Sequence, residues 1–181
     1  LRNSLELAGL ADRLGFHRFW MAEHHATPAL ACASPELMLA AIGRETRHIR
    51  IGTGGVMLPH YSPFKVAESF SMLAGLFPGR VDLGLGRAPG SDQLTAYALQ
   101  QDRRTRAQAD FPQQLAELMA HFDGTLPSDH PFHHLSACLP GGADAPEIWV
   151  LGSSADSAEL AALAGLPYCI ADFISGEAPY L

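Results

Sequence analysis

The chain has 181 residues, of which 48% are hydrophobic and 17% are charged, and its formal net charge is -7. This composition predicts a globular fold and excludes a disordered chain. The acidic balance argues against a nucleic-acid partner, because phosphate binding requires clustered Lys and Arg side chains. No apolar run approaches the ~20 residues that cross a bilayer, so we expect no membrane partner.

The cysteines and the chain ends add two further expectations. Three cysteines with wide spacing, Cys32, Cys138 and Cys169, predict neither a disulfide framework nor a metal site. Together with the lack of a visible signal peptide, they favour a reduced, cytoplasmic setting. The chain begins at Leu1 inside a helical pattern and ends just after a strand-like one, so we expect both ends to be cuts through a larger protein.

Helical and strand-like patterns alternate along the chain. Ser-Pro pairs at 34–35 and 62–63 mark helix starts, and small or acidic residues alternate with Val81, Leu83 and Leu85 as in a strand. In chain order, the predicted elements are a helix over 1–14, a strand over 16–22, a helix from 35 to about 46, a strand over 48–56, a helix from 63, a strand over 81–86, helical stretches over 91–108 and 111–122, a strand over 147–151, a helix over 155–164 and a strand over 168–171.

Strands that recur about every 30 residues with helices between them predict βαβ units and a parallel sheet. A doubly wound sheet and an incomplete barrel both fit this count, and glycines on one side of the strand at 81–86 favour the barrel, whose interior is filled by packed layers. We therefore predict an α/β fold, an incomplete (β/α)8 barrel that forms a single domain over 1–181. An insertion at about 88–146 interrupts the alternation, and we expect its irregular part, 123–146, to line some of the substrate pocket.

In a parallel α/β fold, functional groups collect where strands end at their carboxyl side. The first such place holds Glu23, His24 and His25. Paired histidines with a carboxylate serve as metal ligands, as acid–base groups or as structural polar contacts. Adjacent side chains of an extended chain point to opposite sides, which disfavours a shared metal. The position at the strand end leaves an acid–base role and a structural role about equally favoured for His24.

Two glycine-rich segments follow the next strands. Gly54-Gly55 is either a simple turn or a place where the backbone closely approaches a flat ligand. The segment with Gly86 and Arg87 has the spacing G-x-G without the third glycine, so it is not a dinucleotide fingerprint. Its arginine either contacts an anion or a ring, or forms a structural salt bridge.

The segment from Leu151 reads as a strand, a Gly-Ser-Ser turn and a helix. The hydroxyl groups of Ser153, Ser154 and Ser157 at a helix N-terminus are suited to bind phosphate, although a serine there is also an ordinary N-cap. Asp156 opposes a phosphate unless its side chain points outward, and the double serine favours the ligand. A histidine-rich stretch, His130, His133 and His134, matches no standard metal-site spacing, so we interpret it as a loop.

Taken together, these segments resemble the bacterial luciferase-like monooxygenases. The resemblance covers nearly the whole chain and keeps the family's order. The matching segments are FWMAEHH at 19–25, IGTGGVMLPHYSPFKVAE at 51–68, LFPGRVDLGLGRAPGSD at 76–92 and WVLGSSADSAELAALAGLP at 149–167.

The resemblance implies a TIM barrel that binds reduced FMN, supplied by a flavin reductase, and activates molecular oxygen for a small organic substrate, as alkanal monooxygenases do. It also implies a homodimer in the full-length form, with the first and last barrel strands outside this chain. In that family His24 matches the acid–base partner of the flavin chemistry, with His25 beside it. The matches to cofactor-binding positions are Gly54 and Gly55 at a non-proline cis peptide under the flavin ring, Gly86 and Arg87 near the flavin and its phosphate, and Leu151, Ser153, Ser154 and Ser157 at the phosphate loop.

One departure and three alternatives accompany this resemblance. Ser153 stands where the luciferases themselves carry Glu, so light emission is not implied. A flavin- or deazaflavin-dependent oxidoreductase that transfers hydride without using oxygen is the main alternative. A non-catalytic flavin-binding protein and a fragment without independent function are the others.

Overall fold

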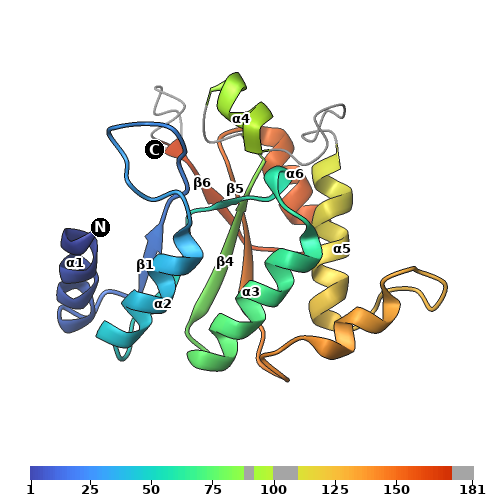
Figure 1. The fold of residues 1–181 in the computed structure, drawn as a ribbon, viewed down its shortest axis with the longest axis horizontal. Coiled ribbons are helices and arrows are strands. Elements are labelled where there is room, and N and C mark those ends of the chain that lie inside the picture. Colours follow the sequence, from blue (N-terminus) through green and yellow to red (C-terminus); the bar gives the residue numbers. More distant parts are fainter. Residues whose placement is uncertain (88–91, 100–109, 173–181) are drawn as a thin grey trace.

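The computed structural model describes residues 1–87, 92–99 and 110–172, so predictions for the remaining positions, including most of the helical stretch 91–108, lie outside it. Within this part no helix is long and apolar enough to cross a membrane. In chain order (Figure 1) the elements are α1 (Arg2–Arg13), β1 (Arg18–Met21), α2 (Pro35–Glu45), β2 (Arg50–Thr53), β3 (Val56–Met57), the 3-10 turn η1 (Leu58–His60), α3 (Pro63–Leu76), β4 (Val81–Gly86), α4 (Gln93–Leu99), α5 (Phe111–Asp123), the 3-10 turn η3 (His133–Cys138), β5 (Glu147–Gly152), α6 (Ala155–Leu163) and β6 (Tyr168–Ile170).

The predicted strand over 48–56 is wrong in one respect, because it forms two strands. Gly54 and Gly55 interrupt it, and the peptide bond between them is cis. Before the glycines, β2 pairs with β1 and β4; after them, β3 pairs with β4, with Val56 beside Leu85. After the break, the chain therefore pairs with β4 and no longer with β1.

The order of the strands decides between the two folds that the sequence left open. The described strands form one parallel sheet in the order β1-β2-β4-β5-β6, with β3 attached to β4. A doubly wound sheet reverses its strand order at a switch point, whereas a barrel places successive strands side by side. The described chain is thus part of a (β/α)8 barrel, as predicted.

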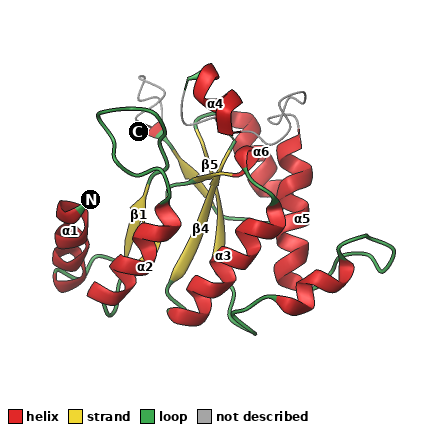
Figure 2. Cartoon of the chain, in the orientation of Figure 1, coloured by secondary structure: helices red, strands yellow, loops and turns green. Residues whose placement is uncertain are grey.

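The two faces of the sheet have different contents. Helices cover one face (Figure 2), and the main apolar core lies between them and the sheet. In β4, Val81, Leu83 and Leu85 belong to this core, as the alternation predicted. Asp82 and Gly84 alternate with them and lie on the opposite face, which is the inner face of the barrel.

A cluster of charged and aromatic side chains occupies the inner face near the amino ends of the strands. Asp82 is fully buried and accepts hydrogen bonds from Arg18 Nε (3.0 Å), Arg50 Nε (2.8 Å) and Trp20 Nε1 (2.9 Å). Glu147 on β5 pairs with both arginines, at 3.1 Å and 3.0 Å. The Arg18 guanidinium lies 4.9 Å from the centre of the Trp149 ring. Four strands are therefore joined by compensated charges at this end.

The irregular segment over 124–146 lies at the same amino ends, which corrects our expectation that it lines the substrate pocket. The chain turns at Gly124, where φ is 65°, and leads into the amino end of β5 (Figure 1). The Gly141 N–H donates to Ser71 Oγ at 2.8 Å, near the end of α3. A segment fixed beside the start of β5 cannot reach the carboxyl ends, because the strand itself separates the two.

Candidate functional site

Glu23, His24 and His25 lie directly beyond the carboxyl end of β1, as predicted. The backbone N–H of His24 donates to the Cys32 carbonyl at 2.9 Å, and its side chain is half-buried. The His25 side chain is 10% exposed, and its Nε2 lies 2.7 Å from Glu23 Oε1. The two histidines therefore have different surroundings, and the structure joins only His25 to the carboxylate.

The Glu23 carboxylate connects this segment to the chain that follows Gly55. Its Oε2 accepts the N–H of Met57 at 3.0 Å, and its Oε1 accepts the hydroxyl of Tyr61 at 2.8 Å. Glu23 is 1% exposed. Burial, followed by the Glu23 charge, raises the pKa of Tyr61 far above its usual value, so this phenol keeps its proton. Burial also raises the pKa of the nearby Glu36 carboxyl, with Glu23 adding to the effect.

Gly54 and Gly55 lie beyond the carboxyl end of β2. They differ in the room that each leaves for a side chain. A β-carbon added at Gly55 would lie 2.7 Å from the Gly84 carbonyl oxygen, closer than side chains approach backbone. At Gly54 the nearest atoms would be those of Trp20, at 3.5 Å, and Leu151, at 3.8 Å, which are ordinary contacts. The requirement for glycine at 55 therefore comes from β4, whereas the space above Gly54 faces the inner side of the barrel.

Gly86 and Arg87 lie at the carboxyl end of β4. Gly86 is buried, and a β-carbon there would meet the end of the flexible Met57 side chain. Arg87 directly follows the strand and is half-buried. The residues after Arg87 belong to the undescribed range 88–91. The structure thus places both predicted residues beside β3, at the same end of the sheet as Glu23.

The predicted phosphate loop joins β5 to α6. Ser154 is the N-cap of α6, and its hydroxyl accepts the Ser157 N–H at 3.4 Å and lies 3.3 Å from Ser157 Oγ. The interpretation as an ordinary N-cap is therefore correct for Ser154, and it leaves Ser153 exposed at the helix start. Asp156 is also exposed. Leu151 faces the inner side instead, against Gly84 and Gly54.

Tyr168 on β6 fixes the shape of this loop. Its hydroxyl lies 2.7 Å from the Gly152 carbonyl oxygen and 3.4 Å from that of Ser154. The Ala171 N–H also donates to the Gly152 carbonyl, at 2.8 Å. The start of α6 is therefore held from the neighbouring strand as well as by its own N-cap.

The remaining candidate residues do not form a site. His133 Nδ1 contacts the Leu126 carbonyl at 2.6 Å, and His130 accepts the Phe132 N–H, so these histidines make local contacts. His133 and His134 lie in the 3-10 helix η3, where we expected a loop. The three cysteines are free thiols. Among the residues that the structure describes, no group of three or more His, Cys, Asp or Glu is arranged to hold a metal.

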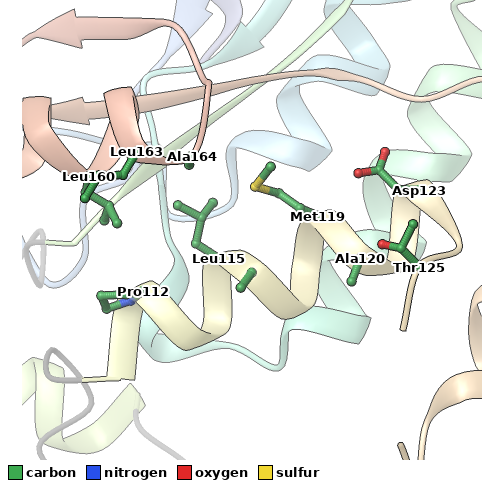
Figure 3. Close-up of a pocket in the computed structure, with 10 residues that line it drawn as sticks. Pro112, Leu115, Met119, Ala120, Asp123, Thr125, Leu160, Leu163 and Ala164 are labelled. Carbon is green, nitrogen blue, oxygen red and sulfur yellow. The ribbon is translucent and has the colours of Figure 1, made fainter. Parts of the chain in front are cut away.

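A groove of about 420 Å³ lies on the outer side of the barrel, between α5 and α6 (Figure 3). Its walls are mainly apolar and include Leu115, Met119, Leu160 and Leu163. It contains none of the predicted catalytic or cofactor-binding residues, although Asp123 and Thr125, from the segment expected to line the substrate pocket, contribute to its wall. We therefore locate the candidate site at the carboxyl ends of the strands.

Sequence reasoning missed two polar residues that organise this end, Tyr61 and Tyr168, and it noticed a third, Glu23, without assigning it a role. Tyr61 lies within a Pro-rich turn, and nothing in its local pattern indicates a contact with Glu23, 38 positions earlier. Tyr168 likewise resembles an ordinary strand residue. Glu23 carried a signal, since a carboxylate directly after a buried strand and beside two histidines is unusual, but its burial follows only from the packing.

Comparison with known proteins identifies relatives along nearly the whole chain. A family model described as luciferase-like monooxygenase matches residues 1–178. The luciferase-like monooxygenase of Escherichia coli (strain K12) is 45% identical over 97% of this chain and 50% of its own length. The N-acetyl-S-alkylcysteine monooxygenase of Bacillus subtilis (strain 168) is 43% identical over 98% of this chain and 52% of its own. The chain therefore spans about half the length of these curated relatives.

Solved structures agree with the fold. The crystal structure of apo-MsnO8 has a TM-score of 0.85 and 46% identity, and the match covers 96% of this chain and 50% of that one. The oxygenating constituent of 3,6-diketocamphane monooxygenase from Pseudomonas putida, a type II Baeyer-Villiger monooxygenase in complex with FMN, has a TM-score of 0.75 and 24% identity. That match covers 93% of this chain and 51% of the other. At this identity the second likeness concerns the fold alone.

Proposed function

The chain belongs to the luciferase-like monooxygenase family, and on that premise we propose that the intact protein is an FMN-dependent monooxygenase. It uses reduced flavin and molecular oxygen to oxidise a small organic substrate. One observation carries the proposal: Glu23, His24 and His25, the Gly54-Gly55 peptide, Arg87 and the start of α6 all follow carboxyl ends of neighbouring strands. In barrel enzymes this is the end at which catalysis occurs.

The residues at this end fit a phosphorylated flavin. The start of α6 offers backbone N–H groups, exposed Ser153 and the Ser154 and Ser157 hydroxyls, which suit a phosphate. Asp156 is exposed, so solvent screens its negative charge. Above Gly54 the inner face is bounded by Trp20 and Leu151, two flat or apolar side chains that suit a ring system. Arg87 adds a positive charge beside β4.

The protein's part in the reaction is to bind, to exclude water and to move a proton. When bound, reduced FMN supplies the electrons that activate oxygen. Trp20 and Leu151 exclude water from the inner face, which protects reactive groups and strengthens local electrostatics. His24 and His25 are the histidines that follow the carboxyl end of β1, and we assign the proton transfer to them. A histidine positioned as a general acid or base typically increases the rate of such a step roughly 10²–10⁴-fold.

Three further parts of the proposal concern the setting. A flavin reductase supplies the reduced cofactor, the intact protein is a homodimer, and it works in a reducing cytoplasm, where its free thiols stay reduced. The substrate is a small organic molecule. Because one relative is named for S-alkylcysteines, a first panel contains alkanals and thioether amino acids.

The test measures flavin binding and oxygen use separately. The intact protein is titrated with FMN under anaerobic reduction and then exposed to oxygen with each substrate. We expect product formation in step with oxygen uptake. In His24→Ala the oxygenation rate falls by about 10²–10⁴-fold, while the Kd for FMN changes by less than about threefold.

The control variant is His48→Ala, which removes an exposed histidine near the amino ends of the strands. We expect it to retain both binding and oxygenation. Equal losses of binding and rate in His24→Ala would contradict an acid–base role. Flavin reduction by substrate without oxygen uptake would indicate hydride transfer, and binding without either reaction would indicate a non-catalytic flavin protein.

A further inference from the structure

The proposed function assigns no role to the buried carboxylate of Glu23. Three groups from separate parts of the chain converge on it: the Met57 N–H, the Tyr61 hydroxyl and the His25 ring, at 3.0, 2.8 and 2.7 Å. Glu23 is 1% exposed and the His25 side chain 10% exposed. A buried carboxylate is costly unless it is paired and hydrogen-bonded, so this arrangement must satisfy its charge.

The identity of the donors determines where the His25 proton lies. A backbone N–H can only donate, and Tyr61 keeps its proton because burial and the adjacent carboxylate raise its pKa. An ionised carboxylate can only accept. The ring nitrogen that faces Glu23 must therefore carry a hydrogen. Beside an ionised Glu23, a neutral His25 ring thus has its proton on Nε2 and a lone pair on Nδ1 that is able to accept another proton.

The charges around the pair strengthen this assignment. Among the described residues, no Arg or Lys forms an ion pair with Glu23, and His25, which can carry a positive charge, is in direct contact with the carboxylate. The Glu36 carboxyl, on α2, has its pKa raised by burial and by Glu23, and burial also raises the pKa of the Cys32 thiol. The His60 ring packs edge-on against His25, with centroids 6.2 Å apart. Neither the Glu36 carboxyl nor the Cys32 thiol supplies a positive charge to Glu23.

We propose that Glu23 is a positioning residue that acts through His25: the carboxylate fixes the ring with Nε2 protonated and stabilises the imidazolium that forms when Nδ1 takes up a proton. The step forms one N–H bond at Nδ1 and breaks the bond between that proton and the reacting group or a water molecule; the same nitrogen later returns the proton. No oxidant or reductant is needed. The inference rests on the proposed function for the reaction that uses this proton.

The first test is the tautomer of His25 in the intact protein without FMN. Nitrogen-15 NMR of labelled histidine distinguishes the two tautomers, and the His25 signals are assigned by their loss in His25→Gln. We expect the Nε2-protonated tautomer in the unsubstituted protein and in Tyr61→Phe, where the Glu23 carboxylate remains. We expect a mixture of tautomers in Glu23→Ala. An Nδ1-protonated ring in the unsubstituted protein would overturn the proposal, whether or not Glu23→Ala folds.

The second test asks whether the two side chains act as a unit during turnover. Glu23→Ala and His25→Ala each lower the oxygenation rate by roughly 10²-fold or more, and the double variant loses no more than either single variant. Losses that multiply in the double variant would contradict a shared role.

The two tests distinguish failure of this inference from failure of the proposed function. An Nε2-protonated ring in a protein that binds FMN but uses no oxygen would support the proposed role of Glu23 and His25 and overturn the proposed monooxygenase function. Full oxygenation with a mixed tautomer in the unsubstituted protein would support the monooxygenase and overturn the pair.

Discussion

Two buried carboxylates lie at opposite ends of the sheet and are compensated in different ways. Asp82, near the amino ends, is fully buried between two arginines and the Trp20 indole. Glu23, beyond the carboxyl ends, accepts hydrogen bonds from neutral donors and contacts a histidine. Arginine stays charged at every pH a protein experiences, whereas histidine changes its charge near neutrality.

From this difference we infer that the amino ends of the strands serve mainly to stabilise the fold and that the carboxyl ends serve the reaction. The charge of Asp82 is balanced permanently, so the amino end is suited to joining strands. In the arrangement we propose, the charge of Glu23 is balanced only when His25 carries protons on both ring nitrogens, so the carboxyl end is suited to proton transfer. Parallel barrels generally divide these tasks between their two ends, and here the division can be tested one residue at a time.

The largest expected effect comes from removing the carboxylate at the amino end. Asp82→Ala leaves Arg18, Arg50 and the Trp20 N–H without their shared acceptor, so we expect the free energy of unfolding to fall by about 3–5 kcal/mol. Chemical denaturation of the intact protein measures it. The exposed Asp129→Ala should change stability by less than about 0.5 kcal/mol. An equally small change in Asp82→Ala would show that the cluster is not structural.

Two adjacent glycines at the carboxyl end are expected to respond differently to substitution. Gly55→Ala forces a β-carbon against the Gly84 carbonyl oxygen, at 2.7 Å, and should destabilise the fold by about 1–3 kcal/mol. Gly54→Ala adds only ordinary contacts, so the variant should be as stable as the unsubstituted protein. The added methyl group would occupy part of the proposed site for the flavin ring, so we expect FMN binding to weaken. Thermal unfolding and FMN titration of both variants measure these effects. Equal destabilisation by the two substitutions would contradict the packing described.

A smaller effect is expected at the predicted phosphate loop between β5 and α6. Tyr168→Phe removes the hydrogen bond to the Gly152 carbonyl oxygen, worth about 0.5–1.5 kcal/mol. We expect the Kd for FMN to rise roughly three- to tenfold. Riboflavin lacks the phosphate, so its Kd should not change. Tyr61→Phe, at the other loop, serves as the control and should leave the ratio of the two Kd values unaltered. A parallel loss of both ligands in Tyr168→Phe would place the phosphate elsewhere.

The smallest effect concerns pH and a histidine of α5. Burial lowers the pKa of His121 despite the nearby Glu117, and its Nδ1 lies 3.0 Å from Ser136 Oγ on η3. The unfolded chain therefore takes up the proton at a higher pH than the folded chain. Stability should be complete above the ordinary histidine pKa of about 6.5 and decrease below it, by at most about 1.4 kcal/mol per pH unit.

Denaturation of the intact protein between pH 7 and 5 checks this sign. His121→Asn should remove most of the slope, and the exposed His48→Asn should keep it. A slope that persists unchanged in His121→Asn would assign the pH dependence to another group.

Much of the fold follows from local patterns, because helix starts, turns and strand alternation depend on neighbouring residues. The Ser-Pro pairs, the alternation in β4 and the Gly-Ser-Ser turn before α6 are examples. The break at Gly54-Gly55 was not predicted from spacing, and the close approach that requires glycine at 55 comes from β4, about 30 residues away. The contacts of Asp82 with Arg18 and of Glu23 with Tyr61 join positions 64 and 38 apart, so they appear only once the sheet is assembled.

The central claim is that the carboxyl ends of the strands hold the flavin while the amino ends hold the fold together. Hydrogen–deuterium exchange of the intact protein, with and without reduced FMN under anaerobic conditions, tests it most directly. We predict that FMN slows exchange at 54–57 and 153–157 and leaves exchange unchanged at 47–51 and 79–82. Protection at the amino ends without protection at 54–57 and 153–157 would contradict the claim.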